Sequence, residues 1–204
     1  MPARELQTAG IVLSASQSGE RFLRLHIFSA EEGRIVAMWR RSEKSSGSGP
    51  DLFDQAHFHL ESSSQSSTWF LKEYRLEHRR VGIARRYRAL LLATRLSELL
   101  WCNLQHAEFY EPTALLAQEA LGAFEDSPLP QCIYLKALYR YASEEGYAVR
   151  QQWLRQLAKS DQDRAKGILG QPLAQLDAEH EPAAEALIEK LERWLRADTD
   201  IMVP

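Results

Sequence analysis

One β-hairpin near the start of the chain constrains the fold more than any other feature. Residues 19–41 read GERFLRLHIFSAEEGRIVAMWRR. In the first arm, apolar side chains alternate with polar ones, a period of two that is typical of a strand with one buried face. A polar turn over residues 29–33 ends in glycine, which readily adopts positive φ. The second arm is apolar and ends in Arg40-Arg41, so the hairpin predicts a small β-barrel with a cationic rim.

The first 80 residues contain five strand candidates. They are Thr8–Ala15, Arg21–Ser29, Arg34–Arg40, Phe53–Glu61 and Thr68–Leu76. A loop rich in serine and glycine, residues 42–50, separates the third candidate from the fourth. Five short strands with a long connection after the third favour a Greek-key barrel of the OB-fold type. We therefore predict an N-terminal OB-fold domain over residues 1–80.

After Gly82 the apolar period changes to that of a helix. The candidates are Ile83–Leu104, Ala114–Phe124, Gln131–Ser143, Val149–Ala158, Ser160–Ile168 and a last helix with Pro182 in its first turn. In the last helix, Glu192 and Arg196 are expected to pair on the solvent side. The sequence thus predicts an α+β protein, a five-stranded OB-fold barrel followed by an all-α domain over residues 81–204.

Charge is distributed unevenly along the chain. Residues 1–88 carry 14 Lys and Arg against 10 Asp and Glu, whereas residues 89–204 carry 11 against 18. An anionic polymer is therefore expected to bind the front half and to be repelled by the back half. We expect no membrane span and no secretory signal, because no apolar run is long enough. The cytoplasm is the expected compartment.

Basic residues of the first domain form the main candidate binding site. They are Arg21, Arg24, Arg34, Arg40, Arg41, Lys44, Lys72, Arg75, Arg79 and Arg80. A guanidinium is permanently charged and donates to phosphate in a planar fork. Phe22, Trp39 and Trp69 lie among these residues, and aromatic rings can stack on bases. Any one of these arginines is most simply a solvated surface residue, but the set as a whole favours nucleic-acid binding.

The basic run continues to residue 88, where Arg85, Arg86 and Arg88 follow Arg79 and Arg80. It either lines a cleft between the two parts or forms an exposed helix start.

Nothing in the sequence argues for catalysis. The chain has no G-x-S-x-G, P-loop, G-x-G-x-x-G or H-E-x-x-H motif. His57 and His59 share a strand face with Glu61, but no third strong ligand is evident, so we expect no metal and no cofactor. A metal-dependent nuclease that uses the two histidines is the most distant alternative.

One helix of the second half is unusually aromatic. Residues 133–142 read IYLKALYRYA, and Tyr134, Lys136 and Arg140 are candidates for a groove that binds a protein partner. A core helix with its tyrosine hydroxyls at the boundary is the simpler interpretation.

Four stretches of the chain matter together: GIVL at 10–13, GERFLRLHIFSAEEGR at 19–34 with the RIVAMWRR that follows, YRALLLATRLSELL at 87–100 and YLKALYRYASEEGY at 134–147. Together they resemble the bacterial recombination mediator RecO family. Their order and spacing carry the resemblance, which covers most of residues 8–155. The acidic region from Asp161 onward matches nothing in the family's pattern. Many members hold zinc through four cysteines, whereas Cys102 and Cys132 stand alone here, so the chain resembles a zinc-less member.

The resemblance implies an OB-fold, a helical domain, and binding and annealing of single- and double-stranded DNA. It also implies partnership with a RecR-type protein and with the C-terminal tail of single-stranded-DNA-binding protein in loading a recombinase. The leading expectation is therefore a non-enzymatic DNA-binding mediator of DNA repair and recombination, cytoplasmic and nucleoid-associated. The alternative is a protein-interaction adaptor of the same fold that binds repair or replication partners but not DNA.

Overall fold

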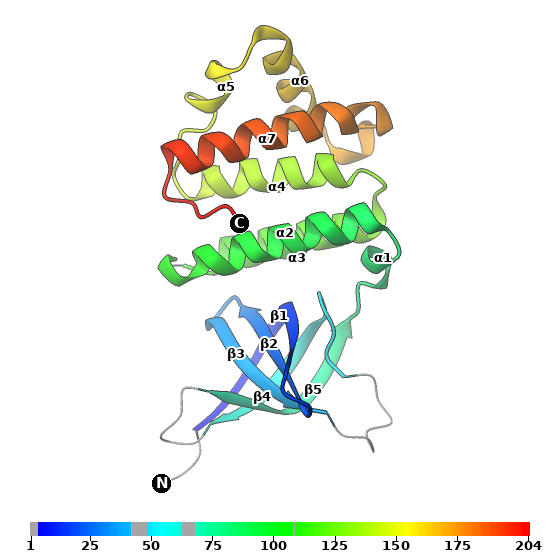
Figure 1. The fold of residues 1–204 in the computed structure, drawn as a ribbon, viewed down its shortest axis with the longest axis vertical. Helices are drawn as coiled ribbons and strands as arrows, with labels where there is room; N and C mark the ends of the chain where they lie inside the picture. Colours follow the sequence, from blue (N-terminus) through cyan, green and yellow to red (C-terminus); the bar gives the residue numbers. More distant parts are fainter. Residues whose placement is uncertain (1–3, 42–48, 63–67, 108) are drawn as a thin grey trace. The chain divides into compact units, whose positions relative to one another are not determined.

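The computed structural model describes residues 4–41, 49–62, 68–107 and 109–204. The chain divides into two compact units, each with its own internal contacts (Figure 1). The strand unit comprises Met1–Arg80 and Leu104–Leu115, and the helical unit comprises Val81–Asn103 and Leu116–Pro204. The sequence had placed residues 104–115 with the helices, whereas their contacts are with the strands.

Five strands in the first 80 residues followed by helices confirm the predicted α+β class (Figure 1). The strands are β1 (Arg4–Ser18), β2 (Phe22–Ser29), β3 (Gly33–Arg40), β4 (Gln55–Ser62) and β5 (Trp69–His78). They hydrogen-bond in a closed ring in the order β1-β2-β3-β5-β4. The β3–β5 pairing is parallel and short, whereas the other four pairings are antiparallel.

The strand β1 is longer than predicted because it serves two neighbours. Its first half pairs with β4 and its second half with β2, and a bulge between Val12 and Ser14 marks the change. A bulge bends a strand and increases its twist, which lets one strand belong to both sides of a closed sheet. Inside the ring, alternate side chains form the core: Val12, Leu25, Ile27, Ile35, Ala37, Ala56, Phe58, Leu60 and Leu71.

Residues 104–115 cover one end of the β2–β3 hairpin. Gly33 has a φ of +69°, and a Cβ there would lie 2.4 Å from the ring of Tyr110. The same ring packs edge to face on Phe28, with 6.5 Å between centroids. Glycine is required at this turn both for its backbone conformation and for the close approach of the tyrosine.

After β5, the described residues form seven α-helices and three short 3-10 turns. They are α1 (Val81–Ala84), α2 (Tyr87–Asn103), η1 (Leu104–His106, which belongs to the strand unit), α3 (Glu111–Asp126, whose part through Leu115 belongs to the strand unit), α4 (Pro130–Glu144), α5 (Trp153–Gln156), α6 (Lys159–Gly170), η2 (Leu173–Gln175), η3 (Ala178–His180) and α7 (Glu181–Asp198). Of these helices, α4 packs against both α2 and α7 (Figure 1).

Two predicted helices differ in the structure. The first is broken into α1 and α2 at Arg85 and Arg86. The Arg86 guanidinium donates to carbonyls at the end of α3, including that of Glu125 at 2.7 Å. The predicted helix over residues 149–158 was wrong for most of its length, because turn hydrogen bonds occupy residues 149–152 and only the single turn α5 is helical.

The predicted pair of Glu192 and Arg196 in α7 forms, but its carboxylate is buried and has a closer partner in Arg95. The carboxylate of Glu192 accepts two hydrogen bonds from Arg95 Nη2, at 2.6 and 2.8 Å, and one from the Tyr134 hydroxyl at 3.1 Å. Glu192 is only 5% exposed, and Arg196 lies farther away at 3.8 Å. Within the described ranges, no helix combines the length and the apolar character needed to cross a bilayer.

Candidate nucleic-acid interface

Four of the ten predicted basic residues lie at one end of the β2–β3 hairpin, and two of them, Arg24 and Arg40, point outward from the ring. Across this antiparallel pair, Phe22 lies opposite Arg40 and Arg24 lies opposite Met38. Opposite residues share a face, so Arg24 and Arg40 are diagonal neighbours, about 7 Å apart between Cα atoms. The backbone N–H of Arg41 donates to the carbonyl of Arg21 at 2.8 Å, which places these two arginines at the end of the same hairpin.

These four arginines are exposed. Within the described residues, none of them forms an ion pair with a carboxylate. The sequences of β2 and β3 contain no Asp or Glu, so no carboxylate of these two strands neutralises them. An exposed arginine with its five donors available to solvent is suited to phosphate.

Two phenylalanine rings lie beside these arginines. Phe70, at the start of β5, pairs with Met38 of β3, and its ring meets that of Phe22 edge to face at 6.4 Å. Phe70 is 41% exposed. The sequence analysis named Trp39 and Trp69 instead, but both pack against the core of the ring. The alternation of residues in β5 could have identified Phe70 from the sequence. Leu71 is buried, so its neighbour Phe70 points outward.

We call the set Arg21, Phe22, Arg24, Arg40, Arg41 and Phe70 the cationic face. His26 lies next to it on β2, and its pKa is lowered by burial first and then by the charges of Arg24 and Arg34. The repulsion that disfavours a proton on His26 is the same potential that attracts an anion.

Arg34 belongs to the other end of the hairpin. It lies opposite Phe28, six residues before Arg40, or about 20 Å along the strand. Its Nη1 atom donates to the side-chain oxygen of Gln105 at 3.3 Å, next to the segment that covers this end. Arg34 is therefore separated from the cationic face.

Lys72 and Arg75 follow Phe70 along β5. Lys72 Nζ is 2.7 Å from a carboxylate oxygen of Glu61. Arg75 lies opposite His57 and lines a hollow of about 580 Å³ together with Glu73. Both residues have carboxylates or histidines as neighbours, unlike the four arginines at the hairpin end.

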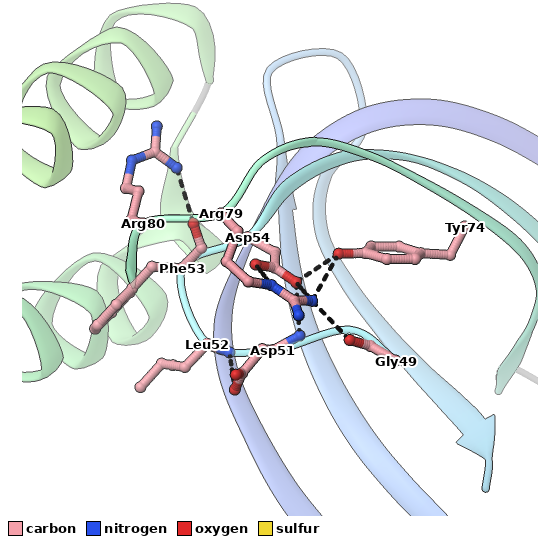
Figure 2. Close-up of polar contacts among 8 residues, drawn as sticks. All are labelled: Gly49, Asp51, Leu52, Phe53, Asp54, Tyr74, Arg79 and Arg80. Atoms are coloured by element: carbon pink, nitrogen blue, oxygen red, sulfur yellow. Dashed lines mark hydrogen bonds and ion pairs between the residues drawn. The ribbon is translucent and has the colours of Figure 1, made fainter. Parts of the chain in front are cut away.

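Arg79 has an internal partner (Figure 2). Its Nε and Nη2 atoms donate to the fully buried carboxylate of Asp54, at 2.9 and 2.6 Å. The Tyr74 hydroxyl donates to the same carboxylate at 2.5 Å, and Nη2 also reaches the carbonyl of Gly49 at 2.7 Å. Burial first, and the neighbouring Asp54 second, raises the pKa of Tyr74. The hydrogen bonds to Asp54 likewise raise the pKa of Arg79.

Arg80 was predicted to bind DNA, but it is only 5% exposed and bonds within the protein. Its guanidinium donates to the carbonyl of Phe53 at 2.8 Å and to the side chain of Gln55 at 3.0 Å (Figure 2). Phe53 has a φ of +66°, an unusual conformation for a non-glycine residue, and Arg80 bonds to its carbonyl. Lys44 lies outside the described residues.

In the helical unit, the candidate groove is only partly formed by the predicted residues. Tyr134 is buried at 1% exposure and bonds to Glu192, so it cannot line a surface. Lys136 and Arg140 do border a hollow of about 190 Å³ between α3 and α4, with an apolar floor. Lys136 Nζ donates to the carbonyl of Gln171 at 2.7 Å, and Arg140 pairs with Glu144 at 2.7 Å and with Glu119.

Comparison with known proteins adds no assignment: no family model matches the sequence, and neither does any curated protein.

Proposed function

We propose that this protein is a non-enzymatic DNA-binding mediator of DNA repair and recombination, and that single-stranded DNA lies across the cationic face. The observation that carries the proposal is the meeting of four exposed arginines and two exposed or half-exposed phenylalanine rings at one end of the β2–β3 hairpin. Phosphates bind the guanidinium groups, and bases stack on Phe22 and Phe70.

The ring topology supports assignment to the OB-fold. A five-stranded Greek-key ring is the architecture of that fold, which binds oligonucleotides with strands 2 and 3 and with the loops that connect strands 1–2 and 4–5. Arg21 lies between β1 and β2, and Phe70 is the second residue of β5. The cationic face therefore coincides with the surface that this fold uses.

Stacking favours the single strand, because paired bases do not present their faces to a protein. Duplex DNA is then held more weakly, through its phosphates alone. A protein that holds single strands without base specificity fits strand annealing and the loading of a recombinase, in partnership with a RecR-type protein at the nucleoid.

The test is a fluorescence-anisotropy titration of a labelled oligothymidylate with the full chain at several salt concentrations. Arg24→Ala/Arg40→Ala is compared with Lys72→Ala/Arg75→Ala, which removes the same charge from residues of β5 that have carboxylate or histidine neighbours. Each phosphate contact to a single strand contributes about −0.7 to the slope of log K against log salt. We expect the first double variant to flatten the slope by about 1.4 and the second to leave it unchanged.

Equal slopes in the two double variants would remove the cationic face from the proposal. Absence of binding to the wild-type chain, even at low salt, would leave the adaptor function in its place.

The hollow between α3 and α4 favours one further function, the binding of an acidic peptide with an apolar end. Ile133 and Leu173 line its floor, and Lys136 supplies positive charge at its border, where Arg140 is paired with Glu119 and Glu144. The tail of single-stranded-DNA-binding protein has this chemistry, and it is the partner we propose for the groove. Titration with a labelled tail peptide tests it: Lys136→Ala is expected to weaken binding, whereas Lys159→Ala, a matched exposed lysine on α6, leaves it unchanged. Equal affinities in both variants would exclude this groove.

A further inference from the structure

We propose that the outward face of β1 and β4 binds a divalent transition-metal ion of the zinc class through Glu5, His59 and Glu61. The sequence suggested no third ligand beside His59 and Glu61. The structure supplies it from the first strand, because Glu5 lies directly opposite Glu61 in the β1–β4 pairing.

Strand pairing puts the three side chains on one face. His59 lies opposite Gln7, two residues along β1 from Glu5, so it is the diagonal neighbour of Glu5. One ligand atom from each residue lies within 4.8 Å of the others, and His59 Nε2 is 3.8 Å from a Glu5 carboxylate oxygen. Ligand atoms around tetrahedral zinc are about 3.3 Å apart, given bonds of about 2.0–2.2 Å. Rotation of the two long, partly exposed glutamate side chains brings their carboxylate oxygens to the separations that zinc requires.

The imidazole of His59 is the second observation that points to a ligand. Its Nε2 atom is buried and, among the described residues, has no hydrogen-bond partner. A buried polar atom without a partner destabilises the fold, whereas a metal ion satisfies it. His57, two residues earlier on the same strand, differs, because its Nε2 lies 2.6 Å from a carboxylate oxygen of Glu77.

The charges around the cluster favour a cation. Two glutamates directly opposite each other on neighbouring strands repel. Lys72 offsets one of them through its contact of 2.7 Å with Glu61, which leaves Glu5, Glu61 and Lys72 with a formal charge of −1. A divalent ion takes the place of Lys72 and joins β1 to β4 where these two strands meet in the ring.

One imidazole and two carboxylates suit zinc and leave a coordination position for water. The test is calorimetric titration of the full, chelator-stripped chain with zinc chloride, together with the melting temperature with and without the ion. We expect one site and a higher melting temperature in zinc. In His59→Ala the affinity falls about tenfold or more, whereas His57→Ala, the matched control, binds as the wild type does. Lys72→Met binds more tightly, because the competing ammonium is gone.

Glu5→Gln is the second test, since Glu5 is largely exposed and the change keeps its shape. It is expected to weaken zinc binding as His59→Ala does, with the metal-free melting temperature unchanged. No zinc binding by the wild-type chain, wild-type affinity in His59→Ala, or loss confined to His57→Ala would overturn the proposal.

Discussion

The strand ring carries two groups of charged residues that differ in what surrounds their charges. Around the cationic face, the β2 and β3 strands contain no carboxylate, and four arginines lie near two aromatic rings. On β1, β4 and β5 lies a second group, which we call the His–Glu face: Glu5, His57, His59, Glu61, Glu73 and Glu77, with Lys72 neutralised beside them. Under the proposed function, the separation of basic residues from carboxylates defines the DNA-binding site, and their number does not.

A further contrast is with Arg79 and Arg80, whose guanidinium groups bond to groups inside the strand unit and stabilise the fold. Arg79→Ala is the largest effect we expect, because it leaves the buried Asp54 carboxylate without its cation. Breaking a buried ion pair in this way costs about 3–5 kcal/mol. Urea unfolding measures the loss. Arg75→Ala, an exposed residue of β5, is the control and is expected to change the free energy of unfolding by less than about 0.5 kcal/mol.

The aromatic part of the cationic face is tested next. Phe70→Ala is expected to weaken binding of a single-stranded oligonucleotide about tenfold, since stacking of one base contributes about 1–3 kcal/mol. Phe109→Ala is a matched control, because Phe109 is an exposed phenylalanine of the same unit outside the cationic face. Anisotropy at fixed salt measures both variants. A similar loss of affinity in the two variants would mean that Phe70 does not stack on the bound oligonucleotide.

The smallest expected effect concerns His26. Its folded pKa lies below the ordinary value of 6.5, so the unfolded chain binds more protons once the pH falls below about 6.5. The free energy of unfolding therefore decreases as the pH falls through that value and is unaffected well above it. Arg24→Ala removes one cause of the shift, so its loss of stability between pH 7.5 and 5.5 should be smaller than that of the wild-type chain. An identical loss in both chains would contradict the positive potential assigned to this face.

The strands were predictable because their pattern is local. Alternation of apolar residues identified the hairpin, and the basic pair at 40–41 marked the end where the cationic face lies. Arg21 and Arg24 come from the same hairpin, so their proximity to that pair follows from antiparallel pairing alone.

The other parts of the site depend on contacts between residues far apart in the chain. The residues next to Arg79 in the sequence do not indicate that it forms an ion pair with the buried Asp54, 25 residues earlier. Glu192 fits an exposed position by local pattern, yet it meets Tyr134 across 58 residues in the interior of the helical unit. Glu5 likewise joins His59 only through the pairing of β1 with β4. Contacts between side chains so far apart leave no periodic pattern in the sequence. They can be identified only from the folded structure.

Cross-link mapping tests the central claim most directly, because it reports which side of the ring touches DNA. The full chain is bound to an oligonucleotide that contains bromodeoxyuridine, irradiated, digested and analysed by mass spectrometry. The account predicts cross-links in peptides that contain Phe22 or Phe70. Cross-links confined to β4 and the first half of β1, on the His–Glu face, would contradict it.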